Sequence, residues 1–269
     1  MEKIKTFILM FALIWLFMYA GEALAGQTGR NAAFIMACGI NLYSYFFSDA
    51  LVLKHYRAQK VSPSSVLYQT VAKLAENAGL PMPKVYIIED DVPNAFATGR
   101  NPEHAAVAAT QGLLQLVNQQ ELEGVLAHEL GHIKHYDILI SSVAAVFASA
   151  IAMLANIGRY QDNQNRRGIL AVILLPIAAT LIQMSVSRNR EYAADARSAV
   201  LTKHPEWLVS ALQKLEAYSK QKPVKNSTPQ TAHIFTVDPL KNISGLFSTH
   251  PSTADRIKRL QAIKQKLEQ

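Results

Sequence analysis

Long apolar stretches alternate with amphipathic and polar segments along this chain. Residues 7–20, 32–53, 138–157 and 169–186 are apolar enough for a bilayer, whose hydrocarbon core takes about 20 residues of helix. The first two stretches follow one another closely and predict a helical hairpin. A cleaved signal peptide ending at residues 23–25 is the alternative for the first stretch.

The second pair of apolar stretches has two interpretations. Small residues in 138–157 allow close helix packing in a membrane, and Pro176 should kink the stretch at 169–186. The loop at 158–168 carries three arginines, which the positive-inside rule does not favour on the outer side. We expect two further membrane spans, with a hairpin that enters only partway or packs on the domain as the alternative.

Basic residues flank the first hairpin on one side. Lys3 and Lys5 precede it, and Lys54, Arg57 and Lys60 follow it. The positive-inside rule therefore puts both ends of the hairpin in the cytoplasm. The net charge is +7, but we find no basic stripe with interleaved aromatic residues and expect no nucleic-acid partner.

The remaining segments predict a mixed, mainly helical domain. Residues 62–79 have the periodicity of an amphipathic helix, and residues 84–89 and 105–110 predict two strands of a small hairpin or meander. Residues 94–99 are either a plain turn between these strands or a sheet edge that holds a substrate strand. Further helices are predicted at 119–137, at 187–203, at 205–220 and from Ser252 onward.

The strongest chemical signal is the sequence His128-Glu129-Leu130-Gly131-His132. Two histidines four apart lie on one face of a helix, so both imidazoles can bind a single zinc ion. Glu129 can then reach a water on that metal and act as general base. Asn118 and Glu121 form a capping box that starts the helix. The pattern predicts a metalloprotease of the zincin type.

A zincin site needs a third protein ligand. The continuation typical of metzincins is absent, because residue 138 is isoleucine. Glu191 and Asp195 lie four apart after the last apolar stretch, so Glu191 can bind zinc and Asp195 can accept the second ring N–H of His128. An ordinary salt bridge to a neighbouring arginine is the alternative for Glu191, and His135 is a rival ligand.

These motifs resemble those of the HtpX-type membrane zinc metalloproteases, relatives of the CAAX prenyl endopeptidase. The resemblance covers the chain from about residue 60 to its end. It rests on residues 94–99 (Asn-Ala-Phe-Ala-Thr-Gly), residues 125–132 around the two histidines, residues 187–195, and residues 249–252 with Arg256.

The resemblance implies a protease of membrane-protein quality control in the bacterial inner membrane. Its substrates would be misfolded or damaged membrane proteins, or unfolded polypeptides. It also implies contacts of Asn94, His250 and Arg256 with the substrate or transition state. A structural role at the start of the last helix is an equal alternative for His250 and Arg256.

The sequence therefore predicts an α+β, mainly α, integral membrane protein with about four transmembrane helices and a zincin-type catalytic domain containing a small β-sheet. We divide it into a membrane hairpin (1–56), a first catalytic part (57–137), a second hairpin (138–186) and a second catalytic part (187–269). The expected activity is that of a gluzincin with one Zn²⁺, its site facing the cytoplasm. A non-catalytic zinc scaffold and a CAAX-type prenyl-protein protease are the alternatives.

Overall fold

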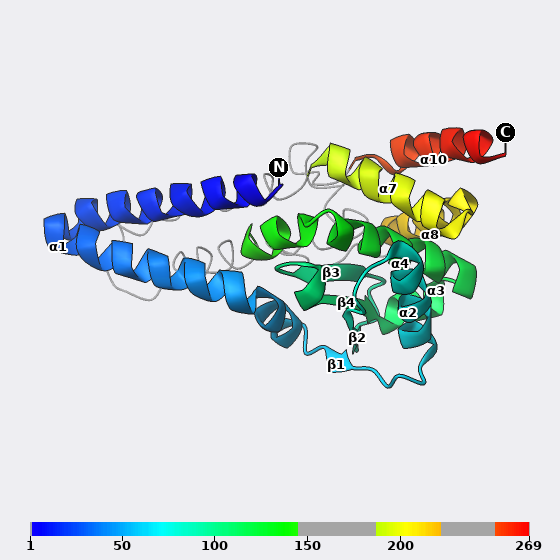
Figure 1. The fold of residues 1–269 in the computed structure, drawn as a ribbon, viewed down its shortest axis with the longest axis horizontal. Helices are drawn as coiled ribbons and strands as arrows, with labels where there is room; N and C mark the ends of the chain where they lie inside the picture. The colour runs from blue at the N-terminus through cyan, green and yellow to red at the C-terminus, as the bar shows by residue number, and fades with distance from the viewer. Residues whose placement is uncertain (1, 145–186, 222–250, 269) are drawn as a thin grey trace.

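A long apolar hairpin projects from a body of helices that surround a small sheet (Figure 1). The computed structural model describes residues 2–144, 187–221 and 251–268. The fourth apolar stretch and most of the third lie outside these residues, as does His250. The described part is mainly helical with one mixed sheet, as the sequence predicts.

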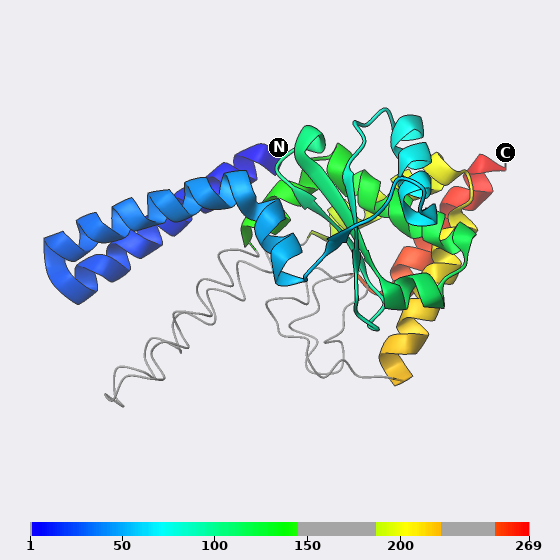
Figure 2. The same cartoon turned by 90° about the horizontal axis from the view of Figure 1, so that it is seen from below.

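The hairpin is built from α1 (Glu2–His55), whose helical geometry is interrupted at Ala25 and Gly26. Gly26 has φ 60°, a left-handed conformation that glycine adopts without strain. The two arms then lie side by side (Figure 2), and two glycines face each other across them. A Cβ on Gly21 would lie 2.4 Å from the carbonyl oxygen of Gly29. The predicted hairpin is confirmed.

Large apolar side chains cover the outside of this hairpin. They include Phe11, Trp15, Tyr19 and Ile35, which are 64–75% exposed. Exposed apolar surface on such a scale indicates contact with lipid or another apolar partner. Within the described residues, Ala25–His55 is the one helix long and apolar enough to cross a membrane, and Thr6–Tyr19 is a shorter apolar helix.

The sheet differs from the expected hairpin or meander. Its strands are β1 (Gln59–Lys60), β2 (Lys84–Ile88), β3 (Ala95–Gly99) and β4 (Ala105–Thr110), in the order β1-β2-β4-β3. Of the two interpretations of residues 94–99, the plain turn is wrong, because residues 95–99 form β3, an edge strand antiparallel to β4. Since the chain reverses once before β3 and once after it, β2 and β4 run parallel.

Helices complete the described body, six of them lying entirely within the described residues and one further helical segment beginning at Asp137. The helix α4 is central to it and packs against α2, α7 and α8. Glycines allow this close packing: Gly124 faces the backbone of Leu208 on α8, and Gly131 faces Ala194 on α7. The helices are α2 (Val66–Ala78), α3 (Gln111–Leu116), α4 (Gln119–Lys134), α7 (Arg188–Thr202), α8 (Pro205–Gln221) and α10 (Thr253–Leu267).

The helix α4 begins where the sequence predicts but ends three residues earlier. Asn118 and Glu121 form the expected capping box at its start. Its end comes at Lys134 rather than at residue 137, because Tyr136 adopts a left-handed conformation with φ 63°. Such a conformation is uncommon for a bulky residue and gives no signal in the sequence. Helix resumes at Asp137, so the break decides where Asp137 lies relative to the two histidines.

Candidate metal centre

Three predicted ligands meet where α4 packs against α7. His128 and His132 present their Nε2 atoms to one another at 3.2 Å. The carboxylate of Glu191 approaches them at 3.7 Å and 3.5 Å, respectively. One ligand atom from each residue lies within 4.8 Å of the others, close enough for all three to bind a metal ion. His135 lies exposed at the C-cap of α4 and is not part of this group.

Carboxylates on the far side of both rings orient them toward a cation. Asp195 lies 2.9 Å from His128 Nδ1, and Asp137 lies 3.1 Å from His132 Nδ1. A ring that donates its Nδ1–H to a carboxylate presents a lone pair at Nε2. The two Nε2 atoms lie 3.2 Å apart beside a carboxylate, so a proton or a metal ion must occupy the space that they share. The donor set therefore fits zinc, which prefers imidazole and carboxylate ligands.

The carboxylate of Asp137 is the part of this arrangement that sequence reasoning missed. Five residues after His132, it would point about 140° away from that histidine on a continuous helix. The break at His135 and Tyr136 returns it to the ring. One signal in the sequence points to Asp137: it is an acidic residue directly before the apolar stretch at 138–157.

Replacing Asp137 with alanine should weaken metal binding about 10–100-fold, because His132 loses the partner that fixes its tautomer. Asp137→Asn should lose less, since an amide oxygen can still accept the ring N–H. Metal retention against a graded chelator measures both variants. The control is Glu103→Gln, which removes an exposed carboxylate elsewhere. Equal metal retention in Asp137→Ala and wild type would contradict the role of Asp137.

The proposed base, Glu129, is buried beside the two histidines. Its carboxylate accepts a hydrogen bond from the backbone N–H of Ala97 on β3. Burial raises its pKa, and the negative charge of Glu191 adds to this, while the histidines and the Ala97 bond oppose it. A carboxylate with a raised pKa is suited to taking up a proton near neutral pH. The strand β3 thus lies directly beside the reacting group.

Neighbouring charges shift the pKa values of His132 and Asp195 in opposite directions. Burial lowers the pKa of His132, but Asp137, Glu191 and Glu129 outweigh burial and raise it to about 9. Metal binding must therefore displace a proton from this ring. Burial raises the pKa of Asp195, but the adjacent guanidinium of Arg256 reverses this and holds it at about 2. Asp195 consequently stays ionised beside His128.

Arg256 comes from α10 and is 1% exposed. Its Nε and Nη2 donate to the two carboxylate oxygens of Asp195 at 2.9 Å and 2.7 Å. Nη2 also lies 3.5 Å from His128 Nδ1. The last helix thus reaches the candidate centre through one buried arginine.

Asn94 is buried just before β3, where its backbone N–H donates to the hydroxyl of Thr110.

This fold and donor set define a metal-dependent peptidase of the zincin type. The chain belongs to peptidase family M48, whose model matches residues 62–264. It is therefore a metalloprotease. Its apolar hairpin contains a helix long and apolar enough to cross a membrane, as in a membrane protein.

Close relatives span the whole chain. It is 56% identical to the "Protease HtpX homolog" of Campylobacter hominis, over 99% of this chain and 100% of the relative. The proteins of the same name from Campylobacter curvus and a Sulfurovum species are 54% and 53% identical, each over 98% of this chain, and 98% and 100% of those relatives are covered.

A solved structure shares the fold. The crystal structure of Ste24p from S. mikatae matches 96% of this chain with a TM-score of 0.54 and 18% sequence identity. The match covers 65% of the Ste24p chain, so this protein spans about two thirds of its length. At this level of identity the likeness concerns the fold alone.

Proposed function

We propose that this metalloprotease is a zinc endopeptidase that cleaves misfolded or damaged membrane proteins at the cytoplasmic face of a bacterial inner membrane. The observation that carries the proposal is the meeting of His128, His132 and Glu191 beside Glu129. Zinc bound there would polarise the scissile carbonyl and lower the pKa of its water toward about 7.

The protein's own groups would bind and orient the substrate and move the proton. Glu129 takes the proton of the attacking water and passes it to the leaving amine. The Ala97 N–H, which points away from β4, holds this carboxylate at the outer edge of β3. A substrate strand lying along that edge would bring its peptide bonds past Glu129. Asn94 would support the start of this edge, and His250 would contact the substrate.

In this proposal the catalytic body faces the cytoplasm, and two membrane hairpins alternate along the chain with the two halves of the catalytic domain. Lys54, Arg57 and Lys60 follow the hairpin, which supports a cytoplasmic body. Segments 1–56 and 138–186 would act as membrane hairpins, with the latter spanning the bilayer. Segments 57–137 and 187–269 would form the two halves of the catalytic domain. Such a layout would keep the site next to membrane-embedded substrates.

Cleavage of a destabilised membrane protein in proteoliposomes tests the proposal. We expect a chelator to stop cleavage and added zinc to restore it in the wild type. Glu191→Ala should stay inactive at the same zinc concentration, because two imidazoles alone bind zinc weakly. Cleavage that survives complete zinc removal would contradict the mechanism. Cleavage restricted to a prenylated peptide would contradict the substrate class.

A further inference from the structure

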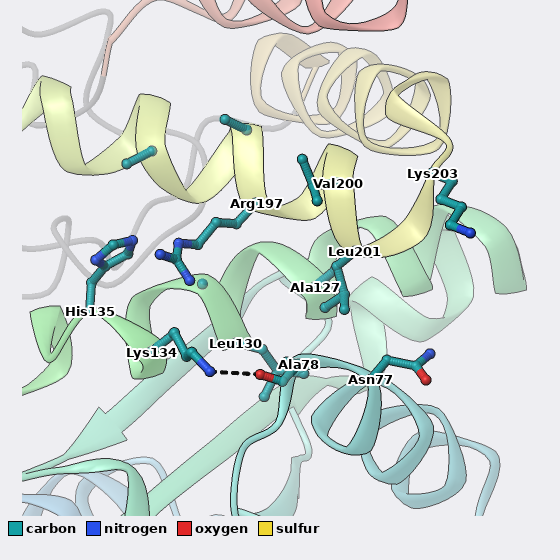
Figure 3. Close-up of a pocket in the computed structure, with 13 residues that line it drawn as sticks. Asn77, Ala78, Ala127, Leu130, Lys134, His135, Arg197, Val200, Leu201 and Lys203 are labelled. Atoms are coloured by element: carbon teal, nitrogen blue, oxygen red, sulfur yellow. Dashed lines mark hydrogen bonds between the residues drawn. The ribbon is translucent and has the colours of Figure 1, made fainter. Parts of the chain in front are cut away.

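A groove of about 820 Å³ lies between α2, α4 and α7 (Figure 3). Its size is that of a pocket for a small organic ligand. The lining from α4 consists of Ala127, Leu130, Gly131 and Lys134. These positions recur at intervals of three and four residues and form one face of the helix.

The groove is separate from the candidate metal centre. His128 and His132 lie on another face of α4, whose mean direction is about 130° around the helix from that of the groove residues. On α7, Ala193, Ala196 and Arg197 line the groove, whereas Glu191 belongs to the metal side. A ligand in the groove would therefore touch the back of the two helices that carry the metal ligands, without reaching the metal.

The charged side chains that line the groove within the described residues are all positive. They are Lys134, Arg197 and Lys203, and the lining from these residues includes no carboxylate. Arg197 points from α7 toward α4 (Figure 3). This half-buried guanidinium has no hydrogen bond or ion pair within residues 2–144, 187–221 and 251–268. Lys134 donates to the carbonyl oxygen of Ala78 at 2.8 Å and still has two donors left.

The remainder of the lining is mostly apolar and small. A half-buried guanidinium beside such a surface fits an anion that carries its own apolar part. The groove is walled by helices and offers no sheet edge, so an extended peptide has no backbone groups to pair with. The apolar lining residues are Ala78, Ala127, Leu130, Ala193, Ala196, Val200 and Leu201.

We propose that this groove binds an anionic amphiphile, with its carboxylate or phosphate at Arg197 and Lys134 and its alkyl chain against the apolar lining. The membrane supplies such molecules as free fatty acids or as phosphate-bearing lipids with a single chain. The end of the groove at His135 lies next to the segment whose Leu139, Ile140 and Val143 pack on the membrane hairpin. An amphiphile leaving the bilayer would thus meet Lys134 and Arg197 before the far end of the groove at Lys203 (Figure 3).

Binding of radiolabelled dodecanoate to the full chain in phosphatidylcholine nanodiscs tests this proposal. We expect saturable binding of about one molecule per chain above that of empty nanodiscs. Arg197→Gln should weaken it about tenfold, the value of one charge-assisted hydrogen bond. The matched control is Lys258→Gln, which removes an exposed cation from α10 and should bind as the wild type does.

A second variant keeps the test valid if Arg197→Gln folds poorly. Val200 is 63% exposed, so Val200→Glu should fold and should repel the anion, with at least as large a loss of binding. Competition by dodecyl phosphate at lower concentration than by unlabelled dodecanoate would identify phosphate as the preferred head group, and the reverse would identify carboxylate.

Four results would overturn the proposal. One is the absence of saturable binding above that of empty nanodiscs. Another is equal competition by neutral dodecanol, which would remove the role of charge. Competition by inorganic phosphate at the same concentration as the amphiphiles would remove the role of the alkyl chain. Stronger competition by an acidic amphipathic peptide would point to a polypeptide ligand instead.

Discussion

Glu129→Gln should abolish proteolysis while leaving the metal bound. The substitution keeps the size of the side chain, but an amide cannot take a proton from water. The loss of a general base costs about 10²–10⁴-fold in rate. Metal binding should persist because Glu129 lies outside the group formed by His128, His132 and Glu191. Cleavage of a membrane substrate and zinc content should be measured on the same preparation.

A second glutamate on the same helix provides the matched control. Glu123 is half-buried, and its carboxylate lies 3.5 Å from Lys73 on α2, away from the metal ligands. Glu123→Gln should therefore cleave as the wild type does. Loss of zinc from Glu129→Gln would mean that Glu129 is a ligand or that the substitution disturbs α4. Unchanged cleavage by a zinc-loaded Glu129→Gln would rule out the proposed base.

The parts of the site that follow helical periodicity could be predicted from the sequence. His128 and His132, and likewise Glu191 and Asp195, are pairs four residues apart, so one helical turn places each pair on a common face. The structure brings these two faces together, with Asp195 2.9 Å from His128 Nδ1. Asp137 could not be found in this way, because its place depends on the left-handed turn at Tyr136.

The pairing of the strands could not be predicted from local sequence patterns. Residues 84–88 and 105–110 are strands as expected, but their partners are fixed by contacts between distant residues. Segment 95–99 contains small residues and ends in Gly99, so its composition also fits a turn. Its structure comes from pairing with β4, in which Phe96 opposes Ala108. Tertiary context thus decided between two local interpretations.

Replacing Arg256 with methionine should destabilise the catalytic body and weaken metal binding together. Removal of one partner from a buried ion pair leaves the other charge uncompensated, at a cost of about 3–5 kcal/mol. Here the remaining charge is Asp195, whose carboxylate also orients His128. Thermal unfolding and metal retention against a chelator measure the two effects. Lys258→Met, on the exposed face of α10, should change neither.

A double variant separates the structural role of this pair from its role at the metal. Asp195→Asn with Arg256→Met removes both buried charges, so much of the lost stability should return relative to Arg256→Met alone. Metal affinity should stay below that of the wild type, by less than the roughly 10–100-fold expected for loss of the whole orienting group, because the amide oxygen introduced by Asp195→Asn still accepts the His128 N–H but more weakly than a carboxylate does. Recovery of both properties would mean that Asp195 only neutralises Arg256. Recovery of stability alone would make α10 the element that holds the orienting carboxylate of His128 in place.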